Sequence, residues 1–174
     1  DLTSLEGLDN LVEIEYVRIS GNASLTNLDA LNTVETVKSI EIRNNESLIS
    51  LNSFNNLIET QEGIAITDNP SLLKVEGFEE LTGTIQINIL SNPQLKTIEG
   101  FAELKEIGFH LDVIQNDLLE AIIGFNKVEN IGEYNLSINA YRGMTIEENE
   151  SLIRVVGFEN LLTTHQIQIL DNST

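Results

Sequence analysis

The sequence contains no cysteine, which excludes a disulfide framework and a thiolate metal site. Basic residues are also few, since nine Lys and Arg stand against 28 Asp and Glu, giving a formal net charge of −19. A surface of this charge repels nucleic acid and anionic lipid, so we expect neither as a partner. No apolar run approaches the roughly 18 residues that a membrane-spanning helix needs.

The N-terminus has neither an initiator methionine nor a secretory signal. We therefore expect a processed chain or a fragment of a longer protein. Apolar residues make up 41% of the 174 residues, which is typical of a globular chain rather than a disordered one. This length is sufficient for one domain with a hydrophobic core.

An asparagine recurs along the whole chain at intervals of 23 or 24 residues, with one interval of 33. A fixed period in this range is typical of a solenoid. Apolar residues follow each asparagine at fixed distances, as Leu72, Val75, Phe78 and Leu81 follow Asn69. The repeated asparagines are Asn22, Asn45, Asn69, Asn92, Asn116, Asn149 and Asn172.

Short stretches of alternating apolar residues precede the asparagines, as Ile64 and Ile66 precede Asn69. Alternation with period two predicts a strand with one buried face. The sequence therefore predicts a mainly β solenoid of about seven coils of 23–24 residues, one domain over 1–174, with one parallel strand for each coil. We expect each asparagine to lie at the corner where a strand ends. There its amide can bond to turn groups and to the equivalent asparagine of the next coil.

Five of the six phenylalanines fall nine residues after an asparagine, which predicts a stack of rings in the core. A row of small residues stands one position earlier. Either the backbone there needs a positive φ, or the coils approach too closely for a larger side chain. The row comprises Gly7, Ala30, Ser53, Gly77, Gly100, Gly124 and Gly157.

The repeat unit, seen as IEENESLIRVVGFENL at 146–161, resembles the receptor L-domain, a relative of the leucine-rich repeats. The resemblance covers the whole chain. It implies a right-handed β-helix and a non-enzymatic, extracellular or cell-surface domain that offers a sheet face to a partner. The chain lacks the cysteines of the animal receptors, has more coils than one such domain and shows no evident end caps. Binding of insulin-like or epidermal growth factors is therefore not implied. The sequence resembles the cysteine-free bacterial or protist members of the family more than the animal receptors.

Chemical motifs are absent outside the repeat. His110 and His165 begin strands two coils apart, and we interpret both as surface residues. No nucleophile motif, phosphate-binding glycine loop or EF-hand pattern is present. We expect no enzymatic activity, cofactor or metal site, although a weak calcium site between coils stays open.

Five N-glycosylation sequons occur, at Asn22, Asn45, Asn135, Asn149 and Asn172. Asn135 is the only one of them that stands clear of the corner row. A glycan on a corner asparagine would prevent the coils from stacking. If the protein is secreted by a eukaryote, we expect Asn135 to carry the sugar.

The outward positions of the strands predict the most regular exposed surface. Leu90 and Ile114 should be neighbours about 5 Å apart on it, forming a small apolar patch on an acidic protein. Arg43 and Asp112 fall in the same outward rows. The patch either binds a partner or is covered by a loop, a neighbouring domain or a second copy.

The interval of 33 residues predicts a loop insertion at 132–141 that protrudes from the stack. Its two tyrosines, Tyr134 and Tyr141, favour a role in an interface. Leu136 and Ile138 mimic a strand, but the leucine expected three residues after Asn139 is missing. We therefore expect 144–146 to take the position in the main sheet.

Two function classes follow from these observations. The first is an extracellular or cell-surface recognition or adhesion module, which binds a protein or glycan through the sheet face and the loop. The second is a structural repeat subunit of a surface filament, or a spacer without a ligand. Copies of the chain itself are possible partners in both classes.

Overall fold

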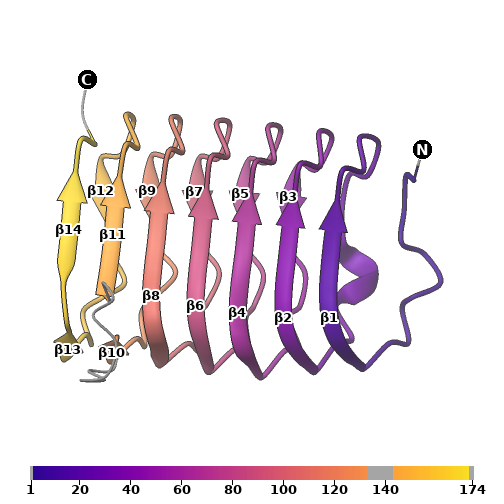
Figure 1. The fold of residues 1–174 in the computed structure, drawn as a ribbon, viewed down its shortest axis with the longest axis horizontal. Coiled ribbons are helices and arrows are strands. Elements are labelled where there is room, and N and C mark those ends of the chain that lie inside the picture. Colours follow the sequence, from indigo (N-terminus) through magenta and orange to yellow (C-terminus); the bar gives the residue numbers. More distant parts are fainter. Residues whose placement is uncertain (1, 133–142, 173–174) are drawn as a thin grey trace.

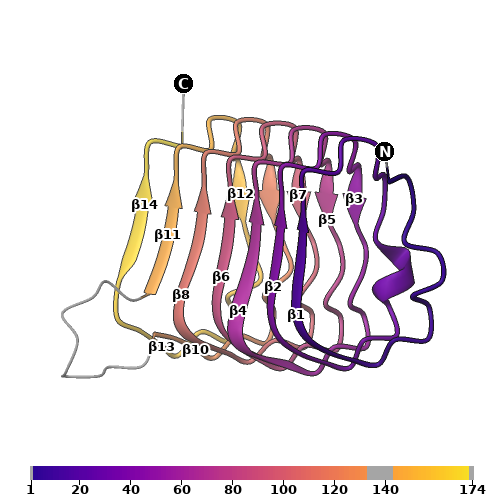
Figure 2. The ribbon, with the colours of Figure 1, turned by 45° about the vertical axis from the view of Figure 1, so that its right-hand side comes forward.

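Stacked coils of parallel strands make up nearly the whole of the computed structural model, which describes residues 2–132 and 143–172 (Figure 1). Each coil crosses one side of the rod as a long strand and returns along the other side through turns and a short strand (Figure 2). The fold is a β-solenoid of the right-handed β-helix class, which confirms the predicted fold class. It has about six turns, where the sequence predicted about seven coils.

The long strands form a parallel main sheet in the order β1, β2, β4, β6 and β8. Beyond β8, the sheet continues as β11 and β14 in the half nearer the asparagine corner, and as β10 and β13 in the other half. These strands are β1 (Glu13–Ser20), β2 (Thr36–Arg43), β4 (Glu59–Thr67), β6 (Gly83–Leu90), β8 (Glu106–Ile114), β10 (Asn130–Ile131), β11 (Gly143–Glu147), β13 (Thr163–Thr164) and β14 (Ile167–Leu170).

The returning side holds a second parallel sheet of two-residue strands, which the sequence pattern did not predict. Its order is β12-β9-β7-β5-β3, with β3 (Ser50–Leu51), β5 (Lys74–Val75), β7 (Thr97–Ile98), β9 (Ala121–Ile122) and β12 (Arg154–Val155). One turn of 3-10 helix, η1 (Asp29–Leu31), lies in the first return. No helix within the described ranges is long and apolar enough to cross a membrane.

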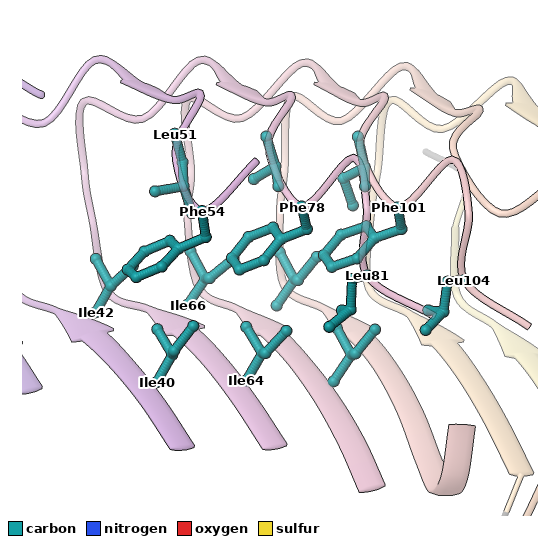
Figure 3. Packing of buried hydrophobic residues seen from close by; sticks show 14 of the residues in the cluster. Ile40, Ile42, Leu51, Phe54, Ile64, Ile66, Phe78, Leu81, Phe101 and Leu104 are labelled. Atoms are coloured by element: carbon teal, nitrogen blue, oxygen red, sulfur yellow. The ribbon is translucent and has the colours of Figure 1, made fainter. Parts of the chain in front are cut away.

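The core lies between the two sheets and is built from the predicted rows. Ile64 and Ile66 point inward from β4 toward Phe78, which has no exposed surface (Figure 3). The phenylalanine rings of successive coils stack with centroids 5.0–5.5 Å apart and interplanar angles of 3–13°. The predicted stack is therefore confirmed, and it comprises Phe54, Phe78, Phe101, Phe125 and Phe158.

The corner asparagines form a continuous hydrogen-bonded row, which we call the asparagine ladder (residues 22, 45, 69, 92, 116, 149 and 172). Asn69 is fully buried, and its Oδ1 accepts hydrogen bonds from both the backbone N–H and the Nδ2 of Asn45, each at 3.2 Å. Its own Nδ2 donates to the carbonyls of Ile42 and Thr67, each at 3.0 Å. Nδ2 also donates to Asn92 Oδ1 on the next coil at 3.3 Å, so the amide bonds to groups on three successive coils, as the sequence predicted for a corner row.

Close approach, not a positive φ, explains the three central glycines of the small-residue row, Gly77, Gly100 and Gly124. A Cβ on Gly77 would lie 2.1 Å from the Ser53 carbonyl oxygen, and one on Gly100 would lie 2.2 Å from that of Gly77. The positive φ falls instead on the next residue, at Phe54, Phe78 and Phe101. At the two ends of the row, Gly7 and Gly157 do have a positive φ.

The insertion interrupts one long strand in the middle. β10 pairs with the amino-terminal part of β8, where Ile131 lies beside Ile107, and β11 pairs with the rest. Met144 lies beside Leu111 and Ile146 beside Val113, so 144–146 takes the main-sheet position, as predicted. Neighbouring strands carry register shifts at this level, which is where an extra segment disturbs the pairing least.

Replacing Asn69 with alanine should strongly destabilise the fold. The substitution leaves the Asn45 N–H and the Ile42 carbonyl buried without their partner. We expect the free energy of unfolding to fall by about 2–4 kcal/mol in denaturant titrations. Asn56→Ala, at an exposed position, is the control and should change it by less than about 0.5 kcal/mol. Equal stabilities of the two variants would contradict the role of the ladder.

Replacing a glycine of the small-residue row with alanine should show whether close approach between coils requires glycine there. Gly100→Ala forces a Cβ against the Gly77 carbonyl, so we expect a loss of about 1–3 kcal/mol in the free energy of unfolding. At Gly83, an added Cβ meets nothing within 4 Å, and Gly83→Ala should be close to neutral. Similar thermal midpoints for wild type and Gly100→Ala would rule out the close approach.

Candidate binding face

The outer side of the main sheet is the candidate site, because period-two alternation sends every second side chain away from the core. We define the binding face as the two outward rows that lie two and four residues before the corner asparagines. The first row is Ser20, Arg43, Thr67, Leu90, Ile114, Glu147 and Leu170. The second is Arg18, Glu41, Ala65, Asn88, Asp112, Thr145 and Gln168.

Leu90 and Ile114 lie side by side in the middle of the binding face, as the sequence predicted. They are direct register partners on β6 and β8. Both side chains are half-buried rather than fully exposed. Thr67 and Glu147 flank the pair on either side. The apolar patch is therefore small, because polar residues bound it on both sides.

Charged residues at the β1–β2 end of the binding face pair with one another. Arg18 Nε lies 2.7 Å from Glu41 Oε2, and an Arg43 guanidinium nitrogen lies 3.5 Å from Glu41 Oε1. The Arg43 side chain remains 47% exposed. Arg43 is thus the predicted site residue that presents a positive charge to an approaching partner.

Asp112 belongs to a polar cluster that the sequence pattern did not reveal. His110 Nε2 lies 3.0 Å from Asn88 Oδ1 and 3.5 Å from Asp112 Oδ2, and both contacts are partly buried. The register that places Asn88 beside Asp112 brings His110 to them from the same strand as Asp112. The spacing of two residues between His110 and Asp112 could have revealed the cluster, because residues two apart in a strand lie on the same side of the sheet.

The binding face is nearly neutral on a strongly acidic chain. Its two rows hold two cations, Arg18 and Arg43, and three carboxylates, Glu41, Asp112 and Glu147. The whole chain has a net charge of −19, so most of the excess negative charge lies elsewhere. The face is thus balanced in charge rather than depleted of it, since five of its 14 positions are charged.

An acidic cleft of about 540 Å³ lies at the asparagine corner, beside the binding face. Its carboxylates are Asp117, Glu148, Glu150 and Asp171. In the part of the chain that the structure describes, no three His, Asp or Glu side chains are grouped closely enough to hold a metal ion. The expected lack of a metal site stays a prediction.

Three of the predicted functional residues, Tyr134, Asn135 and Tyr141, lie outside the described residues. Their roles stay predictions. Gly132, at the start of the predicted insertion, is described, and its N–H donates to the Ile107 carbonyl at 2.9 Å. The candidate site therefore rests on the binding face alone.

No family model, curated protein or solved structure matches this chain. The resemblance to the receptor L-domain accordingly stays a proposal that rests on the repeat unit. What the geometry offers by itself is a solenoid whose outer sheet face carries two nearly neutral rows of side chains.

The ladder makes its sequons poor acceptors once the chain has folded. Asn45 and Asn149 have no exposed surface, and their Nδ2 atoms donate to backbone carbonyls at 3.1 and 2.9 Å. After secretion from a eukaryotic host, we expect peptide mapping to find both unmodified and a glycan at Asn135. An Asn135→Gln variant should lose that mass. Folded monomer with a glycan at Asn45 would contradict the prediction.

Proposed function

We propose that this solenoid is a non-enzymatic recognition module of the receptor L-domain kind, which acts at a cell surface and binds a protein partner through its binding face. The carrying observation is that Leu90 and Ile114 meet at the centre of a nearly neutral face on a chain of net charge −19. The surrounding polar rows resemble the rim of an interface.

The construction of the scaffold supports this assignment. The inward rows are nearly uniform from coil to coil, because the core and the ladder demand it. The outward rows differ at nearly every coil, with Arg, Thr, Leu, Ile and Glu at successive positions of the first row. The stability of the fold does not require different residues at these solvent-exposed positions from one coil to the next. A rigid scaffold that carries a varied surface is suited to recognition.

Substituting both apolar residues of the face provides the test. Leu90→Asp together with Ile114→Asp places two carboxylates at the patch centre while leaving the core intact. We expect circular dichroism and the thermal midpoint to stay close to wild type. Capture of partners from the extracellular protein fraction of the source organism should fall at least about tenfold, because a central hot spot carries most of the binding energy.

The chain offers a matched control on its opposite side. Ile49 and Leu73 are exposed aliphatic residues on adjacent coils, at 50% and 37% exposure. Ile49→Asp with Leu73→Asp adds the same charge at the same spacing away from the binding face. Equal capture by the wild type and the Leu90–Ile114 variant would reject the proposal.

A further inference from the structure

The binding face is unusually flat for a sheet of this width. Adjacent strands of ordinary sheets are rotated by roughly 20–25°. Here the long strands from β1 to β14 lie side by side and run nearly parallel to one another (Figure 1). The register is also continuous across the face, so its side chains form straight rows. A flat face packs best against another flat face, and a second copy of this chain supplies one.

We propose that the partner of the binding face is a second copy of the chain, packed face to face about a two-fold axis that runs parallel to β6. The inference rests on the proposed function, because it takes the binding face as the interface. Rotation about this axis keeps the strand direction and reverses the strand order. β6 then faces β6 of the second copy, β4 faces β8, and β2 faces β11.

Charge complementarity across this axis is the main argument for the arrangement. Along the first row, Arg43 on β2 and Glu147 on β11 lie at equal distances from β6, two strands to either side. The rotation places Arg43 opposite Glu147 of the second copy, and places Glu147 opposite Arg43 of that copy. A single symmetric contact thus yields two ion pairs, as isologous interfaces do.

The remaining positions are compatible with the same axis. Leu90 meets Leu90 of the second copy, and Thr67 meets Ile114, so the apolar patches of both copies join at the centre. In the second row, Asn88 faces Asn88, Ala65 faces Asp112, Glu41 faces Thr145, and Arg18 faces Gln168. No position brings two like charges directly opposite each other, which would cost several kcal/mol.

The size of the face sets the expected strength. Seven strands about 4.8 Å apart, with about five residues of about 3.3 Å each, give a face of about 500 Å². The dimer would bury about 1,000 Å² in total, which is the lower limit for a specific interface. The large negative charge of both copies opposes association as well. We therefore expect a dissociation constant of about 10–100 μM.

Charge reversal tests the axis, with sedimentation velocity as the measurement over concentrations that span this range. Arg43→Glu and Glu147→Arg should each raise the dissociation constant at least about tenfold, because each creates like-charge pairs on both sides of the axis. The two changes in one chain restore both ion pairs and should restore the dimer. Lys74→Glu is the control: it changes the net charge as Arg43→Glu does, but lies on the short sheet, and should leave dimerisation unchanged.

The outcomes distinguish this inference from the proposed function. A wild type that stays monomeric throughout the range overturns the dimer. If the Leu90–Ile114 variant then still loses capture of other proteins, the proposed function stands alone. If neither association nor capture responds to that variant, both proposals fail. A dimer that responds to Arg43→Glu but not to Glu147→Arg overturns the axis, because a two-fold along the rod would pair Arg43 with Glu41 instead.

A cross-linking test uses the absence of native cysteine. Sheets packed face to face lie about 10 Å apart, too far for a direct disulfide, so a short bis-maleimide should join a mixture of Arg43→Cys and Glu147→Cys chains into a heterodimer. Either variant alone should cross-link much less. Cross-linking of Arg43→Cys alone that equals the mixture would contradict the assignment.

Discussion

The buried asparagine amide is the interaction on which the rest of the structure depends. A primary amide without access to water has to satisfy one carbonyl oxygen and two hydrogens inside the protein. Asn69 does so only because the previous coil offers the Asn45 amide groups and the Ile42 carbonyl at the right places. Each coil therefore requires an equivalent asparagine in the next one. This requirement returns each asparagine to the same corner. Most coils do so in 23 or 24 residues, and the interval of 33 residues from Asn116 to Asn149 ends in the same hydrogen bonds.

The same repeat distance imposes backbone conformations that most residues avoid. The residue before each corner asparagine lies in the left-handed region in several coils, including Asp68, Ser91 and Glu148. Phe78 also has a φ of 64°, although such a conformation costs roughly 1–2 kcal/mol for a residue with a side chain. The close approach of Gly77 to Ser53 leaves the next residue to make the turn. Full burial of its ring in the stack offsets that cost.

Most of the fold could be predicted because each repeated residue type in the sequence occupies one fixed position in every coil. The asparagine, leucine and phenylalanine rows each occupy one place in the coil, and Met144 resumes the register after the insertion. The second sheet could not be predicted, since its strands are two residues long and too short to show alternation. The sequence left two explanations for the small-residue row, because a small side chain is equally suited to a positive φ and to a close contact. Only backbone distances decide between them.

The sequence predicted which residues lie on the candidate binding face, but not how far each side chain is exposed. Parallel register made Leu90 a neighbour of Ile114 from the spacing alone. Their half-burial depends on the heights of the side chains around them, which no pattern records. The flatness of the face is likewise a property of the coil stack, because it depends on how each coil lies on the one before it (Figure 1). The uniform coils that the core requires therefore also align the outward side chains in straight rows. The strand on which a charged residue lies then decides which residue of a partner it can face.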